Sequence, residues 1–184
     1  MQKEYDVDVE WKAFDLRPDT PPQGMPRKER PGQSPAGQPV DGHLGDLARE
    51  AGLTMLRAPF TPYTRPAMQA CEYAKTVGKF DELHLGLFKA YWERGANLGD
   101  MAVLKQEAAA AGLDADAMEQ ALATGVFAEQ VQEQVDFAHR VGITGIPAFI
   151  VDGRYLLVGA QPYDTFKQVM ARVLEERQAA LGEG

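Results

Sequence analysis

Residues 141–162 of the chain read VGITGIPAFIVDGRYLLVGAQP, and this segment predicts a β-hairpin. Pro147 opens an apolar run that is long enough for one strand. Asp152-Gly153 then interrupts the run, and this dipeptide suits a two-residue type I′ turn because both central residues of that turn have positive φ. A second apolar run follows, so the segment predicts strand, turn and strand.

Other segments of the chain show the periodicities of further elements. Apolar side chains after the hairpin predict a closing helix with one apolar face, formed by Phe166, Val169, Met170, Val173 and Leu174. Residues 7–14 alternate apolar and polar side chains, which predicts another strand. Residues 18–39 contain seven prolines, which lack backbone donors, so we expect a long, mobile crossing loop there.

Helical patterns fill the middle of the sequence. Three segments between Gly42 and Tyr91 each carry an apolar stripe at helical spacing. Asp100 and Asp114 are good N-cap residues for two further helices, because a carboxylate there accepts bonds from the first backbone N–H groups. We therefore predict an all-helical subdomain over residues 43–124. A last helix leads back to the hairpin and carries Phe127, Val131, Val135 and Ala138.

The composition limits the compartment and the partners. Nineteen basic and 27 acidic residues give a net charge of −8, which disfavours binding to a phosphate backbone, so we expect no nucleic-acid partner. The sequence has no run of about 18 apolar residues and no signal-peptide pattern at its start, so we expect no membrane span. The single cysteine, Cys71, fits a reducing compartment, and the cytoplasm is the expected location.

The order of these elements, with an X-Pro bond at the mouth of the hairpin, resembles the C-terminal half of a thioredoxin fold. It is most similar to the FrnE-like branch of the DsbA family, which is related to 2-hydroxychromene-2-carboxylate isomerases and kappa-class glutathione transferases. The similar stretches run from residues 10–19 through 87–92 to 159–162. The resemblance implies an α/β class: a thioredoxin-like fold, N-terminally incomplete, with an all-helical inserted subdomain.

The resemblance also implies a domain organisation. Residues 1–17 and 125–184 would form the thioredoxin-like domain, residues 18–42 the proline-rich crossing loop and residues 43–124 the helical insertion. The resembled family opens with a strand that leads into a Cys-x-x-Cys, or a serine in the isomerase branch, and this chain begins after that point. We therefore expect either that the natural protein extends upstream of Met1, or that a homodimer supplies the missing central strand.

The Ile146–Pro147 bond is the first candidate binding feature. In the resembled fold this bond is cis, and the backbone of Ile146 then pairs with an extended substrate. Thr144 and Gln161 would flank the same cleft. The alternative is a trans proline that only starts an edge strand.

A second candidate is the loop of Tyr63, Thr64 and Arg65. In the isomerase-like relatives the corresponding turn borders the active-site cleft, so Arg65 would bind a carboxylate of a substrate or of glutathione. The alternative is structural, with Thr64 as a helix N-cap and Pro66 near the helix start.

Other catalytic arrangements are disfavoured by the residues present. Cys71 lies on an alanine stripe inside a helix, which indicates a buried packing residue that reacts slowly. Ser34 is the sole serine and lies in the proline-rich loop. Three histidines and one cysteine show no metal-ligand spacing. We therefore assign no catalytic residue and no metal site.

Three functions remain open at this level. The leading one is a thiol–disulfide oxidoreductase of the DsbA and FrnE type, in which this chain retains the docking half of the site but not the redox cysteines. The second is a glutathione-dependent isomerase or transferase, and the third is a redox-inactive peptide- or thiol-binding module. The first and third need no cofactor, the second needs glutathione, and the expected partner is a peptide or a small thiol or disulfide.

Overall fold

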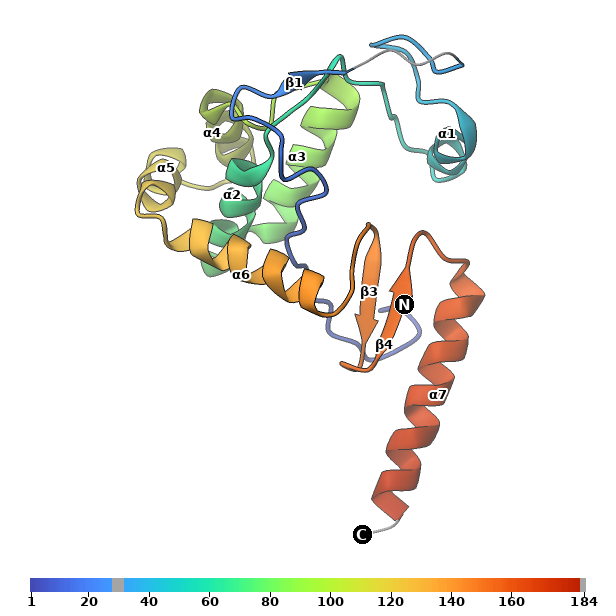
Figure 1. Ribbon diagram of the computed structural model, residues 1–184. Helices are drawn as coiled ribbons and strands as arrows, with labels where there is room; N and C mark the ends of the chain where they lie inside the picture. Colours follow the sequence, from blue (N-terminus) through green and yellow to red (C-terminus); the bar gives the residue numbers. More distant parts are fainter. Residues whose placement is uncertain (28–31, 183–184) are drawn as a thin grey trace. The chain divides into compact units, whose positions relative to one another are not determined.

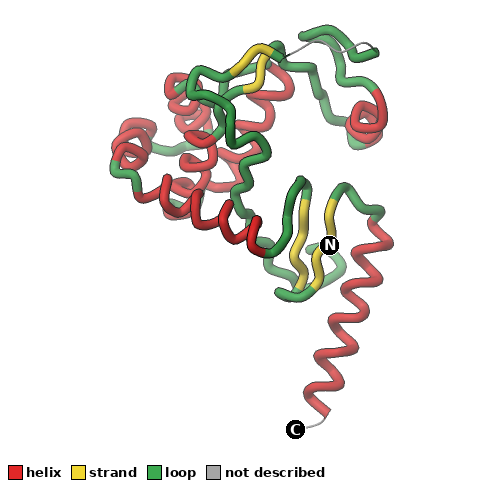
Figure 2. Tube along the Cα trace, in the orientation of Figure 1, coloured by secondary structure: helices red, strands yellow, loops and turns green. Residues whose placement is uncertain are grey.

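The computed structural model describes residues 1–27 and 32–182, and the chain forms two compact units. The first unit comprises Met1–Val135 and the second Asp136–Gly184. Figure 1 shows the elements along the chain, and Figure 2 shows that the regular structure of the first unit is mostly helical, with long loops before α1 (Gly42–Glu50) and between α1 and α2 (Arg65–Thr76).

The first unit contains the predicted helices. They are α1 (Gly42–Glu50), α2 (Arg65–Thr76), α3 (Phe80–Arg94), α4 (Met101–Ala110), α5 (Ala115–Ala123) and most of α6 (Val126–Arg140). Two short antiparallel strands, β1 (Met25–Pro26) and β2 (Phe60–Thr61), pair beside them.

The ends of these helices follow the predicted capping residues. The Asp100 carboxylate accepts a hydrogen bond from Ala102 N at 2.9 Å, and the Asp114 carboxylate accepts one from Ala117 N at 2.9 Å. Gly95 ends α3 in the left-handed conformation with φ of 64°, where glycine avoids the Cβ clash. Capping and glycine signals therefore set the boundaries of α3, α4 and α5.

The core of the first unit lies between α2, α3, α4 and α5. Leu83, Leu104 and Met118 are fully buried there, and burying one such side chain contributes about 1.5–3 kcal/mol. Ala70 and Ala74 on α2 are also fully buried, which lets the neighbouring helices approach closely. The helices predicted for residues 43–124 are present, but the short strand β2 also lies in this range, so the region is not all-helical, and the bounds of the subdomain stay a prediction.

Residues 7–14 do not form the predicted strand. Side chains of two helices hold this segment instead. Lys75 of α2 donates to the carbonyl of Trp11 at 2.6 Å, and the backbone N–H of Ala13 donates to Gln134 of α6 at 2.5 Å. A strand needs a hydrogen-bonded neighbour, and no strand of the described residues pairs with this segment. The alternation of apolar and polar side chains therefore predicted a strand that residues 7–14 do not form.

The proline-rich region is more fixed than its composition suggested. Gly37 N donates to Arg57 O, and Arg57 N donates to Gln38 O, both at 2.8 Å, while Val40 N donates to Met55 O at 2.8 Å. The backbone donors of Gly37 and Val40 thus find acceptors on the neighbouring segment of residues 55–57. A mobile loop was predicted over this region, but backbone hydrogen bonds hold residues 37–40 against residues 55–57. Residues 28–31 of the predicted loop lie outside the described residues.

The second unit contains the predicted hairpin and closing helix. Strand β3 (Ala148–Val151) pairs antiparallel with β4 (Tyr155–Val158), and α7 (Tyr163–Gly182) follows. Within the described residues, β3 pairs only with β4 and not with residues 7–14. The hairpin is therefore a two-stranded sheet supported by one helix.

The hairpin turn has three residues rather than the predicted two. Asp152 and Gly153 do have positive φ, at 54° and 68°. Arg154 N donates to Val151 O at 3.1 Å, but the ladder partner of Val151 is Tyr155. Arg154 is therefore an extra loop residue, and the sequence pattern predicted the turn conformation but not the loop length.

Helix α7 packs on one face of the hairpin. Phe166 contacts Phe149 edge to face at 4.9 Å between ring centroids, and Met170 and Val173 are buried. Leu174 belongs to the predicted apolar face but remains 45% exposed. The buried stripe of α7 is therefore narrower than predicted.

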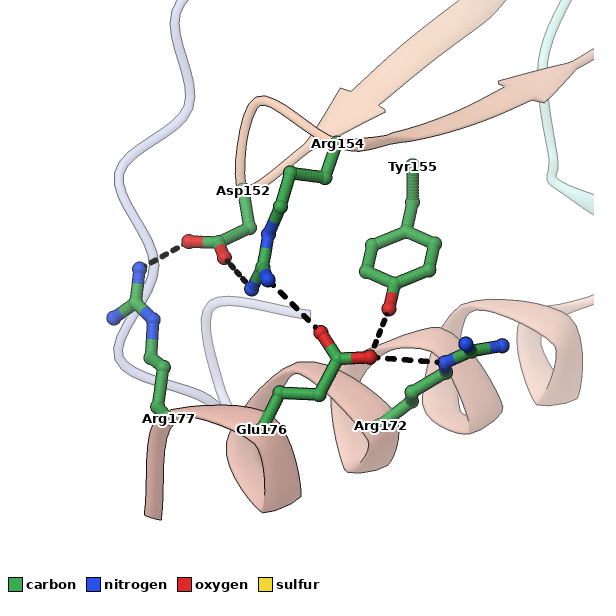
Figure 3. A network of polar contacts seen from close by, with 6 residues as sticks. All are labelled: Asp152, Arg154, Tyr155, Arg172, Glu176 and Arg177. Carbon is green, nitrogen blue, oxygen red and sulfur yellow. Dashed lines mark hydrogen bonds and ion pairs between the residues drawn. The ribbon is translucent and has the colours of Figure 1, made fainter. Parts of the chain in front are cut away.

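A polar network also joins the hairpin turn to α7 (Figure 3). Asp152 accepts from Arg177 of α7 and from Arg154, the latter at 2.6 Å. Glu176 of α7 accepts from the Tyr155 hydroxyl, from Arg154 at 3.0 Å and from Arg172 at 3.1 Å. The bonds from arginine and tyrosine hold the pKa of both carboxyls below their usual values.

Candidate functional site

The loop that leads into β3 starts from a defined helix end. Gly142 adopts φ of 82° after α6, and its N–H donates to His139 O at 3.1 Å. Ile143 N donates to Ala138 O at 2.9 Å, and the Ile143 side chain is buried. These bonds form a Schellman-type helix end with its usual apolar anchor, which fixes where the following loop begins.

Beyond this anchor the loop is exposed. The Ile146–Pro147 peptide bond is cis, as predicted, and the Ile146 side chain is 52% exposed. Pro147 and Thr144 are also exposed. The loop therefore presents a short apolar segment to solvent at the mouth of the hairpin.

The chain that leaves β4 closes against the same loop. Gly159 N donates to the carbonyl of Pro147 at 2.7 Å, and Gly159 adopts φ of 84°. The Gln161 side chain donates to Val158 O at 2.6 Å. The structure thus brings Pro147 and the Gly159–Gln161 segment together, with Thr144 on the approach to them.

This end of the hairpin carries no charge. Residues 141–151 and 155–163 contain no Asp, Glu, Lys or Arg. A charged network, that of Asp152 and Glu176, lies at the other end of the hairpin, at its turn. The loop can therefore offer backbone hydrogen bonds and apolar contacts, but no charged group from these two segments.

The second predicted group, Tyr63, Thr64 and Arg65, lies in the first unit. Thr64 is the N-cap residue of α2 and Pro66 follows near its start, as the structural alternative predicted, although the Thr64 hydroxyl makes no capping bond. Arg65 Nε lies 2.9 Å from a carboxylate oxygen of Asp15, and Arg65 Nη1 donates to Gln132 at 2.8 Å. These contacts give Arg65 a structural role, and its binding role stays a prediction.

Cys71 packs against the helical core as predicted, but it is only partly buried, whereas a buried residue was predicted. Burial raises the pKa of its thiol to about 12, and the neighbouring Glu72 carboxylate acts in the same direction. Because the thiolate is the reactive form, this environment suppresses nucleophilic chemistry.

The other residues considered for chemistry are held in structural contacts. The Ser34 hydroxyl accepts from Arg57 Nε at 3.3 Å. The His84 ring lies against Trp11, Phe80 and Phe88 with centroid distances of 4.7 to 4.8 Å, and burial lowers its pKa. Within residues 1–27 and 32–182, no three His, Cys, Asp or Glu side chains gather closely enough to bind a metal ion.

Two residues that contact the predicted site residues were missed by the sequence analysis, namely Gly159 beside Pro147 and Asp15 beside Arg65. Gly159 directly follows the second strand, and a glycine at that position was an available signal for a close backbone contact. Asp15 gave no such signal, because its partner Arg65 lies 50 positions away in the sequence.

Comparison with known proteins supports one family. A model of the DsbA-like thioredoxin domain family matches residues 1–171. The uncharacterized protein YwbO of Bacillus subtilis (strain 168) is 29% identical over 171 residues, which cover 90% of this chain and 82% of YwbO.

Two solved structures are also similar. The first is the crystal structure of the probable DsbA oxidoreductase SCO1869 from Streptomyces coelicolor, with a TM-score of 0.65 and 27% identity over 72% of this chain. The match spans 58% of that protein, less than two thirds of its length. The second is a 2-hydroxychromene-2-carboxylate isomerase, with a TM-score of 0.54 and 18% identity over 74% of this chain and 66% of the isomerase, which shows a similar fold. The chain belongs to the DsbA-like thioredoxin domain family.

Proposed function

We propose that this chain binds a peptide or a small thiol or disulfide at the Thr144–Pro147 loop, as the docking part of a thiol–disulfide oxidoreductase. The observation that carries the proposal is the exposed, uncharged segment of Ile146 and Pro147 at the mouth of the hairpin. An extended substrate would pair with the loop backbone, and its apolar side chains would contact Ile146.

The chemistry of thiol–disulfide exchange restricts this chain to the docking role. A thiolate attacks a disulfide, and a second thiol must resolve the mixed disulfide that forms. This sequence has one cysteine, and at a pKa of about 12 only about one thiol in 10⁵ is ionised at pH 7. The chain would therefore contribute substrate binding rather than the attacking thiol.

A glutathione-dependent isomerase or transferase is the less favoured function. Glutathione carries two carboxylates, and such a site needs cationic partners for them. Arg65 already contacts Asp15 and Gln132. We therefore propose that the docking loop acts without a bound glutathione cofactor. The net charge of −8 also argues against a nucleic-acid partner.

A cytoplasmic location is the proposal that fits a lone cysteine best, because the cytoplasm keeps thiols reduced. None of the helices in the described chain combines the length and the apolar content needed to cross a membrane.

Peptide binding with an Ile146→Asp variant tests the docking role. A fluorescently labelled, extended apolar peptide containing a disulfide should bind the unmodified chain, and the added charge should weaken binding about tenfold or more. Leu174→Asp is the matched control, since Leu174 is a similarly exposed apolar residue of the same unit. Equal weakening by both variants, or no saturable binding by the unmodified chain, would contradict the proposal.

A further inference from the structure

The first unit contains a cavity that the docking role does not use. It has a volume of about 350 Å³, within the size range of small-molecule sites. Its walls come from the proline-rich region, from the segment before β2 and from the C-terminal end of α3. The side chains that matter here are Ala36, Leu56, Arg57, Pro59, Glu93 and Arg94.

Arg57 is held rigidly at the wall of this cavity. Its side chain is only 12% exposed. Its three nitrogens donate to Ser34 at 3.3 Å, to Gln33 at 2.9 Å and to Asp41 at 3.1 Å. A guanidinium has five N–H donors, so two remain after these bonds. A ligand in the cavity could accept hydrogen bonds from these two N–H groups.

Arg94 supplies a second guanidinium to the lining. One of its nitrogens lies 2.6 Å from Glu107, a carboxylate that is itself 9% exposed and anchors the arginine from outside the lining. Asp41, the acidic partner of Arg57, likewise does not line the cavity. The described lining residues therefore include two arginines and only one carboxylate, that of Glu93.

We propose that this cavity binds a small organic anion with an apolar body. Its carboxylate would accept charge-assisted hydrogen bonds from Arg57 and Arg94, because a guanidinium matches the geometry of a carboxylate. Its apolar body would contact Leu56 and Pro59, which belong to the uncharged part of the wall. The lining residues belong to the first unit and the docking loop to the second, and the proposal does not depend on the proposed exchange function.

Titration with sodium hexanoate, followed by heteronuclear NMR, tests the proposal. Hexanoate should cause saturable shifts at the cavity residues, and Arg94→Gln should weaken binding about tenfold, since a hydrogen bond to a charged group contributes about 1.5–3 kcal/mol. Arg49→Gln is the matched control, because Arg49 is an exposed arginine that pairs with Asp46 on α1. This control should bind hexanoate like the unmodified chain.

Two further measurements test separately the need for space in the cavity and the need for an apolar body in the ligand. Ala36→Trp should fill the cavity and abolish binding without removing a charge. Inorganic phosphate should bind more weakly than hexanoate, because it lacks an apolar body. Equal affinity for phosphate, no saturable shift with hexanoate, or undiminished binding by both Arg94→Gln and Ala36→Trp would each overturn the proposal.

Discussion

At the scale of single residues, Cys71 shows how a local environment decides reactivity. Its thiol packs against the helical core, and burial raises its pKa to about 12. We expect iodoacetamide at pH 8 to label native Cys71 at least about tenfold more slowly than the urea-unfolded chain, because the thiolate is scarce in the folded state. Mass spectrometry over time measures both rates. Labelling at equal rates would show that the packing does not protect the thiol.

The ion pair between Asp15 and Arg65 is the residue-scale contact that holds the N-terminal segment to α2. Asp15 is 6% exposed, so Asp15→Asn leaves Arg65 without its charged partner. We expect this change to lower the free energy of unfolding by about 1–3 kcal/mol, measured by urea denaturation.

Asp46→Asn is the control for this measurement, because the Asp46–Arg49 pair is exposed and such pairs contribute about 0–1 kcal/mol. Adding Arg65→Met to Asp15→Asn should restore part of the loss, since the unpaired charge is then removed. Equal effects of Asp15→Asn and Asp46→Asn would show that the Asp15–Arg65 pair is not a stabilising anchor.

At the scale of elements, the polar network between the hairpin turn and α7 should make their contact depend on pH. The pKa of Glu176 is lowered, first by the Tyr155 bond, and the pKa of Asp152 is lowered, first by the Arg177 bond. A lowered folded-state pKa gives stability above the unfolded-state pKa, and this stability is lost as pH falls through the folded-state value. The pKa of Tyr155 is raised by Glu176, so its contribution is lost as pH rises through the raised value.

The expected result is a stability plateau that falls in both acid and alkali. Glu176→Gln should lower the Tm on the plateau, and its difference from the unmodified chain should shrink in acid, where Glu176 is protonated. Glu175→Gln, one position away on α7, serves as the control. A Tm difference for Glu176→Gln that stays constant from neutral to acid pH would argue against the network.

The same elements show what a sequence pattern can predict. Apolar periodicity and the caps Asp100 and Asp114 were sufficient for the helices, because helical bonds are local. Tertiary hydrogen bonds and strand register decide two other features, and a local pattern does not contain them. These features are the length of the turn at Arg154 and the non-strand conformation of residues 7–14. The segment around Pro39 is fixed by residues 55–57, and neither stretch signals the other in the sequence.

At the scale of the whole molecule, the predicted site residues divide between the two units. Thr144, Ile146, Pro147 and Gln161 lie in the second unit, and Tyr63, Thr64 and Arg65 in the first. The sequence could predict the hairpin and the loop before it because Pro147 and the surrounding glycines mark them, while the binding role of these residues stays a prediction. It could not predict that Arg65 contacts a buried aspartate, because that depends on tertiary packing.

The last prediction concerns turnover by the entire 184-residue chain. Catalysis of insulin reduction by dithiothreitol needs one thiol that attacks and a second that resolves, and this chain has only Cys71. We therefore expect no acceleration above that of a Cys71→Ala variant, measured by insulin turbidity. Peptide binding should be equal in the two proteins, because docking at Ile146 does not use the thiol. Turnover clearly above the Cys71→Ala level would make Cys71 a reactive centre, and loss of peptide binding in that variant would place the docking site elsewhere.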